Sequence, residues 1–190
     1  MGKVKFGSII ADVNRGIRIK SSDLDKLMTY DETDTQYMNV KNLEDGTITG
    51  EMPYIGPLAS KYEKYCLQNG DLVMTKSGYP PKIMVTDLKQ GKKILASGNF
   101  YIITLNQEKA DPNYIAAYLN SAKGRLSLAD ASIGERTPTI SLKELKSIDI
   151  PLPPLEAQRK IGDEYKDLIK ELIKLKSKEE MTRKQLENIM

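Results

Sequence analysis

The sequence predicts an α+β fold in which a small β-rich domain with short helices is followed by a long C-terminal coiled-coil helix. Three observations predict it. Short apolar runs separated by turn dipeptides fill residues 36 to 105, helix-start signals follow from residue 111, and a heptad stripe follows a proline-rich junction near residue 151. We therefore divide the chain into a domain at residues 1–150 and a junction with a helix at 151–190.

The β-rich part is predicted from runs of β-branched and aromatic residues. Turn dipeptides such as Asp45-Gly46, Asn69-Gly70 and Gln90-Gly91 separate these runs, as they do between antiparallel strands. The expected strands are residues 37–40, 47–48, 72–75, 82–85, 93–95 and 100–105.

Two short helices are expected after the strands. Asp111-Pro112 is a helix start, because proline is favoured at the first helical position, and predicts a helix at 112–121. A second helix is expected at 123–131. Residues 139–140 are expected to be extended, and Ser141 with Glu144 forms the Ser-x-x-Glu capping box of a short helical turn.

The proline-rich junction at residues 150–154 predicts a stiff extended lead-in, with a long helix beginning near Leu155. About 34 helical residues at ~1.5 Å each would span roughly 50 Å, which is more than a domain of this size needs to cover itself. A 4-3 spacing of apolar residues along this helix predicts a face that packs against a partner helix. Its apolar members are Ile161, Tyr165, Leu168, Leu172, Leu175, Leu186 and Ile189.

The apolar face of the helix is wider than a narrow coiled-coil line. Ile169 and Ile173 broaden it, so the helix is also able to pack on the domain. A helix that packs only on its own domain stays open as the alternative.

Composition excludes several classes of protein. The chain has 190 residues, a net charge of +3, one cysteine and no histidine. It has no apolar run of membrane-spanning length and no signal peptide pattern, and Cys66 has no partner for an internal disulfide. We expect a reducing, cytoplasmic setting and no membrane association.

Catalytic chemistry is not predicted. Histidine is the commonest general base and metal ligand, and a single cysteine makes no soft-metal site, so we expect no metal, no cofactor and no enzymatic activity. The run Asp111-Pro112-Asn113-Tyr114 resembles the Asp-Pro-Pro-Tyr motif of amino-methyltransferases. It lacks the second proline, and no glycine-rich cofactor loop precedes it, so we interpret it as a helix start.

Cationic and hydroxyl side chains are grouped in three predicted loops, at residues 14–18, 75–80 and 133–138. Arginine and lysine pair with guanine edges and phosphates, and hydroxyl groups bind phosphate. These loops therefore suggest a nucleic-acid surface, although scattered solvated lysines and ordinary surface turns explain the same pattern. The candidate contact residues are Arg15, Arg18, Lys76, Ser77, Tyr79, Arg136 and Thr137.

Four segments together resemble one half of the specificity subunit of type I restriction-modification systems. They are residues 69–78, 110–121, 137–148 and 150–155, the last followed by Glu156, Gln158, Arg159 and Ile161. The resemblance covers nearly the whole chain, and the proline junction is its most specific element. Nothing carries over to residues 20–67, where such domains vary.

The resemblance implies a DNA target-recognition domain followed by one conserved-region helix. It implies double-stranded DNA as a ligand, and modification (methyltransferase) subunits as partners that connect the chain to a restriction subunit. Family members usually hold two recognition domains and two antiparallel helices. With one of each, this chain is expected to pair as a homodimer that reads a bipartite palindromic site.

Three alternatives remain open from the sequence. The chain is also compatible with a piece of a two-domain specificity subunit, or with a recognition domain excised from a methyltransferase fusion. From a different class, it is compatible with a coiled-coil structural adaptor that does not bind DNA.

Overall fold

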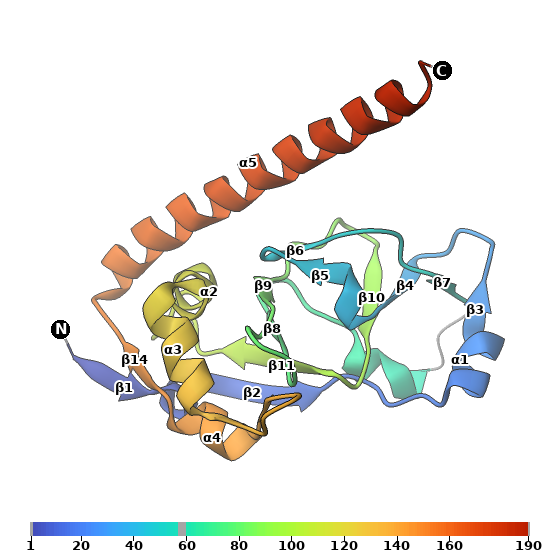
Figure 1. Ribbon diagram of the computed structural model, residues 1–190. Coiled ribbons are helices and arrows are strands. Elements are labelled where there is room, and N and C mark those ends of the chain that lie inside the picture. The colour runs from blue at the N-terminus through green and yellow to red at the C-terminus, as the bar shows by residue number, and fades with distance from the viewer. Residues whose placement is uncertain (1, 57–59, 190) are drawn as a thin grey trace.

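The computed structural model describes residues 2–56 and 60–189. Two four-stranded sheets and four short helices form the body, and one long helix runs across it (Figure 1). No helix within the described residues is both long enough and apolar enough to cross a bilayer.

The first sheet is antiparallel throughout and has the strand order β2-β11-β8-β9. β11 lies inside the sheet and is buried at every residue except Thr104, which explains its nearly continuous apolar sequence. In this sheet Tyr101 pairs with Arg15 on one side and with Met74 on the other. The strands are β2 (Ile10–Arg15), β8 (Leu72–Thr75), β9 (Ile83–Val85) and β11 (Phe100–Leu105).

The second sheet has the order β10-β4-β7-β3 and is mixed. β10 pairs with β4 in parallel, whereas β7 pairs antiparallel with both β4 and β3. The chain builds β8 and β9 of the first sheet between β4 and β10, which gives the long crossover that a parallel pair needs. The strands are β3 (Met28–Thr29), β4 (Thr35–Met38), β7 (Tyr54–Ile55) and β10 (Lys93–Ala96).

Three two-stranded ladders complete the strands. β1 (Lys3–Lys5) pairs with β14 (Asp149–Pro151), β5 (Leu43–Glu44) pairs with β6 (Thr47–Ile48), and β12 (Ser132–Ile133) pairs with β13 (Thr139–Ile140). Short 3-10 helices are η1 (Phe6–Ile9), η2 (Val40–Asn42) and η3 (Ser60–Tyr65).

Side chains cap the starts of α2, α3 and α4. The Asp111 carboxylate accepts from the Tyr114 N–H at the start of α2 (Pro112–Asn120), and Ser121 caps α3 (Ala122–Asp130) in the same way. Ser141 caps α4 (Leu142–Ser147). The remaining helices are α1 (Ser21–Leu27) and α5 (Leu155–Glu187).

The apolar core has two main parts. The larger one joins the first sheet to η1, α2, α3 and α4, with Phe6, Ile103 and Leu119 fully buried. The second lies between the two sheets around Met38 and Phe100. A small third cluster around Tyr37 and Leu95 supports the outer side of the second sheet.

Several predictions from the sequence are confirmed. The long helix begins at Leu155, α2 begins after its Asp111 cap, and strands form at the segments predicted around residues 47–48, 72–75, 82–85, 93–95 and 100–105. The strand expected at 37–40 instead covers Thr35–Met38, because Val40 enters η2.

The interpretation of residues 14–18 as a loop was partly wrong. Asn14 and Arg15 end β2, because hydrogen bonds to the apolar strand β11 extend the ladder through polar residues. Among the strands and α-helices, the sequence did not predict β1, β2, β3, β5, β7, β12 and α1.

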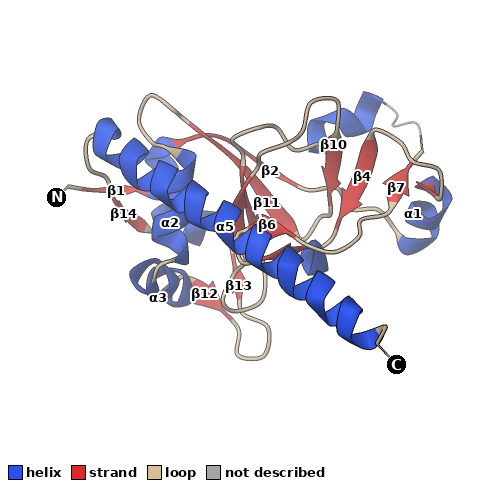
Figure 2. Cartoon of the chain, turned by 90° about the horizontal axis from the view of Figure 1, so that it is seen from above, coloured by secondary structure: helices blue, strands red, loops and turns tan. Residues whose placement is uncertain are grey.

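α5 follows the body only for part of its length. Its N-terminal half packs on α2, and its C-terminal end extends beyond the body (Figures 1 and 2). The long helix is therefore attached at one end and projects at the other.

Candidate nucleic-acid interface

Three cationic side chains lie together at one end of the first sheet, and we call them the basic cluster: Arg15, Arg18 and Lys76. Arg15 ends β2, and Lys76 follows the last residue of β8. β2 and β8 flank β11, so the ends of both strands lie beside the start of β11. The Lys76 N–H donates to the carbonyl of Asn99 at 2.9 Å, just before β11 begins.

The charge of the basic cluster is concentrated and unbalanced. Burial lowers the pKa of Lys76, and the positive charges of Arg18 and Arg15 lower it further. Among residues 2–56 and 60–189, no carboxylate oxygen lies within 4.0 Å of any of the three charged groups. An anion bound here would relieve this repulsion, as DNA phosphates do.

Tyr101 and Gly98 hold the two arginines in place. The Arg15 guanidinium carbon lies 5.9 Å from the centre of the Tyr101 ring, in cation–π range. A Cβ at Gly98 would lie 2.6 Å from Cγ of Arg18, so the arginine stem packs directly over this glycine. Sequence reasoning missed both supporting residues, because Tyr101 belongs to an apolar run that is typical of core.

A second contact joins the loop after β8 to the β12–β13 hairpin. Ser77 forms an isolated bridge with Thr139, and the Gly78 N–H donates to the carbonyl of Pro138 at 2.9 Å. The Ile140 N–H donates to the Lys76 carbonyl at 3.0 Å. These bonds fix the hairpin beside the basic cluster.

The exposed tips of these two segments carry the remaining candidates. Tyr79 is 52% exposed in the loop after β8. Arg136 and Thr137 are exposed between β12 and β13. The hairpin, orange in Figure 1, lies on the side of the body away from α5. The seven candidate residues thus come from three distant segments that meet at one end of the first sheet.

Lys92 and Lys93, which follow Lys76 in the sequence, do not lie with it in the fold. Lys92 pairs with Glu32 at 3.1 Å, and Lys93 pairs with Glu63 at 3.5 Å, both near the second sheet. These lysines lie away from the basic cluster, and acids partly neutralise their charge.

The predicted partner face of α5 is split between two environments. Tyr165 is partly buried and accepts a hydrogen bond from Nδ2 of Asn120 at 3.0 Å, and burial raises the pKa of its hydroxyl. Leu172 is also partly buried. Exposed side chains make up the rest of the predicted face, namely Ile161, Leu168, Leu175, Leu186 and Ile189.

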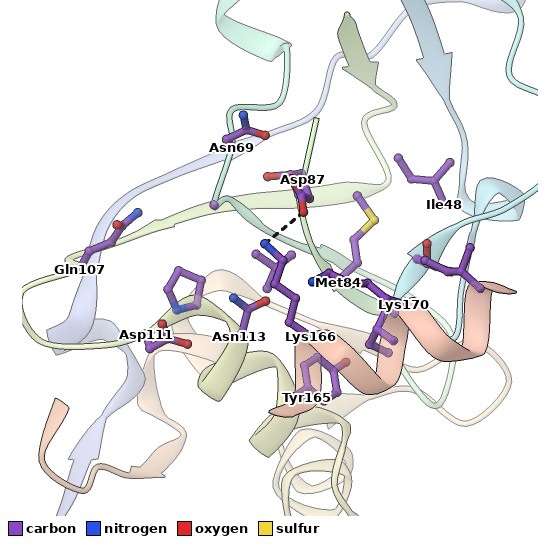
Figure 3. Close-up of a pocket in the computed structure, with 18 residues that line it drawn as sticks. Ile48, Asn69, Met84, Asp87, Gln107, Asp111, Asn113, Tyr165, Lys166 and Lys170 are labelled. Atoms are coloured by element: carbon purple, nitrogen blue, oxygen red, sulfur yellow. Dashed lines mark ion pairs between the residues drawn. The ribbon is translucent and has the colours of Figure 1, made fainter. Parts of the chain in front are cut away.

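A pocket of about 590 Å³ separates α5 from the body just beyond their contact (Figure 3). Tyr165, Lys166 and Lys170 reach it from α5, and Asn113 reaches it from α2. Lys166 pairs with Asp87 at 3.1 Å across it. The pocket belongs to the junction between helix and domain, and not to the basic cluster.

Comparison with known proteins identifies the family. Residues 10–183 match the family model described as the type I restriction modification DNA specificity domain. The chain belongs to this family. The specificity domain therefore includes both the β-rich body and most of α5.

Individual relatives agree with this family. A type I restriction enzyme specificity subunit of Methanocaldococcus jannaschii is 36% identical over 92 residues, which are 46% of this chain and 21% of that protein. The S subunit of a type I restriction-modification system from M. genitalium superposes with a TM-score of 0.65 at 17% identity, over 96% of this chain and 42% of the other.

Two further structures share the fold. The HsdS subunit from Thermoanaerobacter tengcongensis gives a TM-score of 0.61 at 19% identity, over 97% of this chain and 46% of that one. A chain from a structure on the complex assembly and conformational transition of the type I R-M system gives 0.63 at 18% identity, over 99% of this chain and 43% of that one. This chain thus spans less than half the length of each of these solved chains.

Proposed function

We propose that this chain is the sequence-specific DNA recognition component of a type I restriction-modification complex, with no catalytic role of its own. The observation that carries the proposal is the meeting of Arg15, Arg18 and Lys76 beside the exposed hairpin that bears Arg136. The cluster supplies phosphate contacts, and the exposed loop and hairpin supply side chains for base edges in the major groove.

The proposed partners follow from the family. Double-stranded DNA binds the seven candidate residues, modification subunits bind α5, and a restriction subunit joins through the modification subunits. Methylation itself is assigned to the modification subunits. This chain supplies the contacts to the bases and fixes the distance between the two half-sites.

The proposed assembly is a homodimer. Leu168 and Leu175 on α5 are each 58% exposed. A second copy of α5 lying antiparallel would cover these and the other exposed apolar side chains of the helix. A helix of ~50 Å would separate the two half-sites by about 15 base pairs at most, at ~3.4 Å per pair. This chain spans less than half of each solved relative, so two copies related by symmetry would supply two recognition domains.

The same coverage is equally compatible with a second candidate, in which this sequence is one half of a longer two-domain subunit. In that case the second recognition domain and helix come from the same polypeptide. The two candidates differ in the DNA that the isolated chain selects.

The test is selection from randomised duplex DNA, with and without modification subunits, followed by sequencing of the bound fraction. A bipartite palindrome is expected for the homodimer, and a single unpaired half-site for half of a longer subunit. No enrichment in either condition would rule out the recognition function. Mass measurement at micromolar concentration that finds only monomer, with and without DNA, would contradict the homodimer.

A further inference from the structure

A buried glutamine fastens the start of α5 to the body. Gln158 is buried, with only 1% of the residue exposed. Its Oε1 accepts from the Asp111 N–H at 3.0 Å, and its Nε2 donates to the carbonyls of Lys109 at 3.1 Å and Pro153 at 2.8 Å. One side chain therefore links the helix, the proline junction and the segment that leads into α2.

Gly162 lies one turn further along the same face of α5 and permits close approach to α2. A Cβ there would lie 2.3 Å from Oδ1 of Asp111 and 3.1 Å from the Tyr114 backbone nitrogen. That Oδ1 already accepts from the Tyr114 N–H at 2.8 Å as the cap of α2. The carboxylate is not free to move without losing its capping bond, so only glycine fits without a shift of the helix.

Further contacts between α5 and the body lie C-terminal to Gly162. Tyr165 accepts from Asn120, and Lys166 and Lys176 pair with Asp87 and Asp45 on different loops of the body. In these outer ion pairs the carboxylates are exposed and the lysines are partly exposed, and such surface pairs contribute little. The buried polar contact at Gln158 and the backbone approach at Gly162 therefore restrain the direction of the helix more strongly than these ion pairs do.

We propose that Gln158 and Gly162 are positioning residues that set the angle between α5 and the recognition domain, and thereby the spacing between the half-sites. This inference rests on the function proposed above. A tilt of roughly 6° at the base displaces the far end of a ~50 Å helix by about 5 Å, which is between one and two base pairs. A small change at this contact is thus expected to change the length of the non-contacted spacer.

The experiment compares Gly162→Ala and Gln158→Met with the unchanged chain, together with its modification subunits. Each protein selects from duplexes with random sequence and mixed spacer lengths. Alanine is a better helix former than glycine, so Gly162→Ala does not weaken the helix itself. Methionine keeps the approximate volume of Gln158 but makes none of its hydrogen bonds. Matched controls are Ser177→Ala and Gln185→Met, at exposed positions of the same helix.

Both variants are expected to select the same half-site sequence at a spacing shifted by at least one base pair, or spread over several spacings, whereas both controls keep the original single spacing. Folded variants with an unchanged spacing would overturn the inference. Variants that lose the half-site sequence itself would also overturn it, because these residues would then support the recognition domain and not its angle. If the unchanged chain selects no bipartite site, the proposed function fails first, and the two failures are thereby distinguished.

Discussion

The hydroxyl of Tyr101 donates a hydrogen bond to the carbonyl of Ile140 at 3.0 Å, and the ring of the same tyrosine lies under the Arg15 guanidinium. Tyr101 is in the central part of the first sheet and Ile140 is in the second strand of the hairpin. One buried side chain therefore joins the two parts of the proposed DNA surface, the basic cluster and the hairpin.

Tyr101→Phe is expected to lower the free energy of unfolding by about 1 kcal/mol or somewhat more, because the buried Ile140 carbonyl loses a partner. It should also weaken specific DNA binding, since the hairpin loses a link to the sheet. Urea denaturation and fluorescence anisotropy measure the two effects. Tyr114→Phe is the matched control, because its hydroxyl donates to Pro151 far from the hairpin. Equal losses of DNA affinity in both variants would show that only stability matters.

Arg136→Ala is expected to weaken specific binding by about 1–3 kcal/mol if Arg136 reads a base, and to relax the preference at one position of the half-site. The exposed side chain contributes little to the fold, so the free energy of unfolding should stay the same. Competition binding with single-base variants of the selected site makes the measurement. Arg159→Ala, at an exposed position on α5, is the control. An unchanged affinity would remove Arg136 from the interface.

Lys76→Met is expected to reduce DNA affinity and the dependence of that affinity on salt, while slightly raising stability. Burial and the two arginines lower the pKa of Lys76, so its charge opposes folding at neutral pH. This penalty is fully present below the lowered folded pKa and disappears as the pH rises from there to the ordinary lysine value. The gain from the substitution should be below about 1 kcal/mol, since solvent screens a partly exposed ammonium.

Urea denaturation at pH 7 and near pH 10 tests the stability effect, and the gain should shrink at the higher pH. DNA titrations at several salt concentrations test the loss of a phosphate contact, which should reduce the salt slope by about 1. Lys89→Met replaces an exposed lysine elsewhere and should change neither stability nor the slope. A stability gain without any loss of DNA affinity would place the basic cluster outside the interface.

The double variant Leu168→Glu and Leu175→Glu is expected to weaken self-association strongly. Both side chains are largely exposed on the single chain, so the monomer should remain folded, whereas burying charges between two helices is costly. Sedimentation should report a dissociation constant raised at least about 30-fold, which corresponds to about 2 kcal/mol. Ser177→Glu adds charge at another exposed position as the control. A double variant that still sediments as a dimer would exclude this face of the helix.

The sequence predicted best what depends on neighbouring residues. The proline junction, the Asp111 cap and the Ser141 cap are local signals, and each marks the helix start that the structure has. The parallel pairing of β10 with β4 and the pairing of β1 with β14 depend on partners distant in sequence, which no local pattern encodes.

For the candidate site, too, the sequence predicted local features and missed the contacts between distant segments. The residue types in the three polar segments suggested a DNA surface, but their meeting depends on which strands flank β11. Tyr101 and Gly98 went unrecognised, because a buried aromatic residue and a turn glycine have the same sequence pattern whether or not they support a site. The division of α5 into a face on the body and an exposed face needed the position of α2.

The ladder between β1 and β14 delays completion of the domain during synthesis. Lys3, Val4 and Lys5 pair with Pro151, Ile150 and Asp149, so one of the earliest strands waits for the last strand before α5. Pairings between such distant residues close large loops and form late in folding. A nascent chain that stops before residue 149 has none of β14, and its first strand keeps an unpaired edge, which is a site for aggregation. The body therefore gains the β1–β14 ladder only after residues 149–151 have been made and are free to pair.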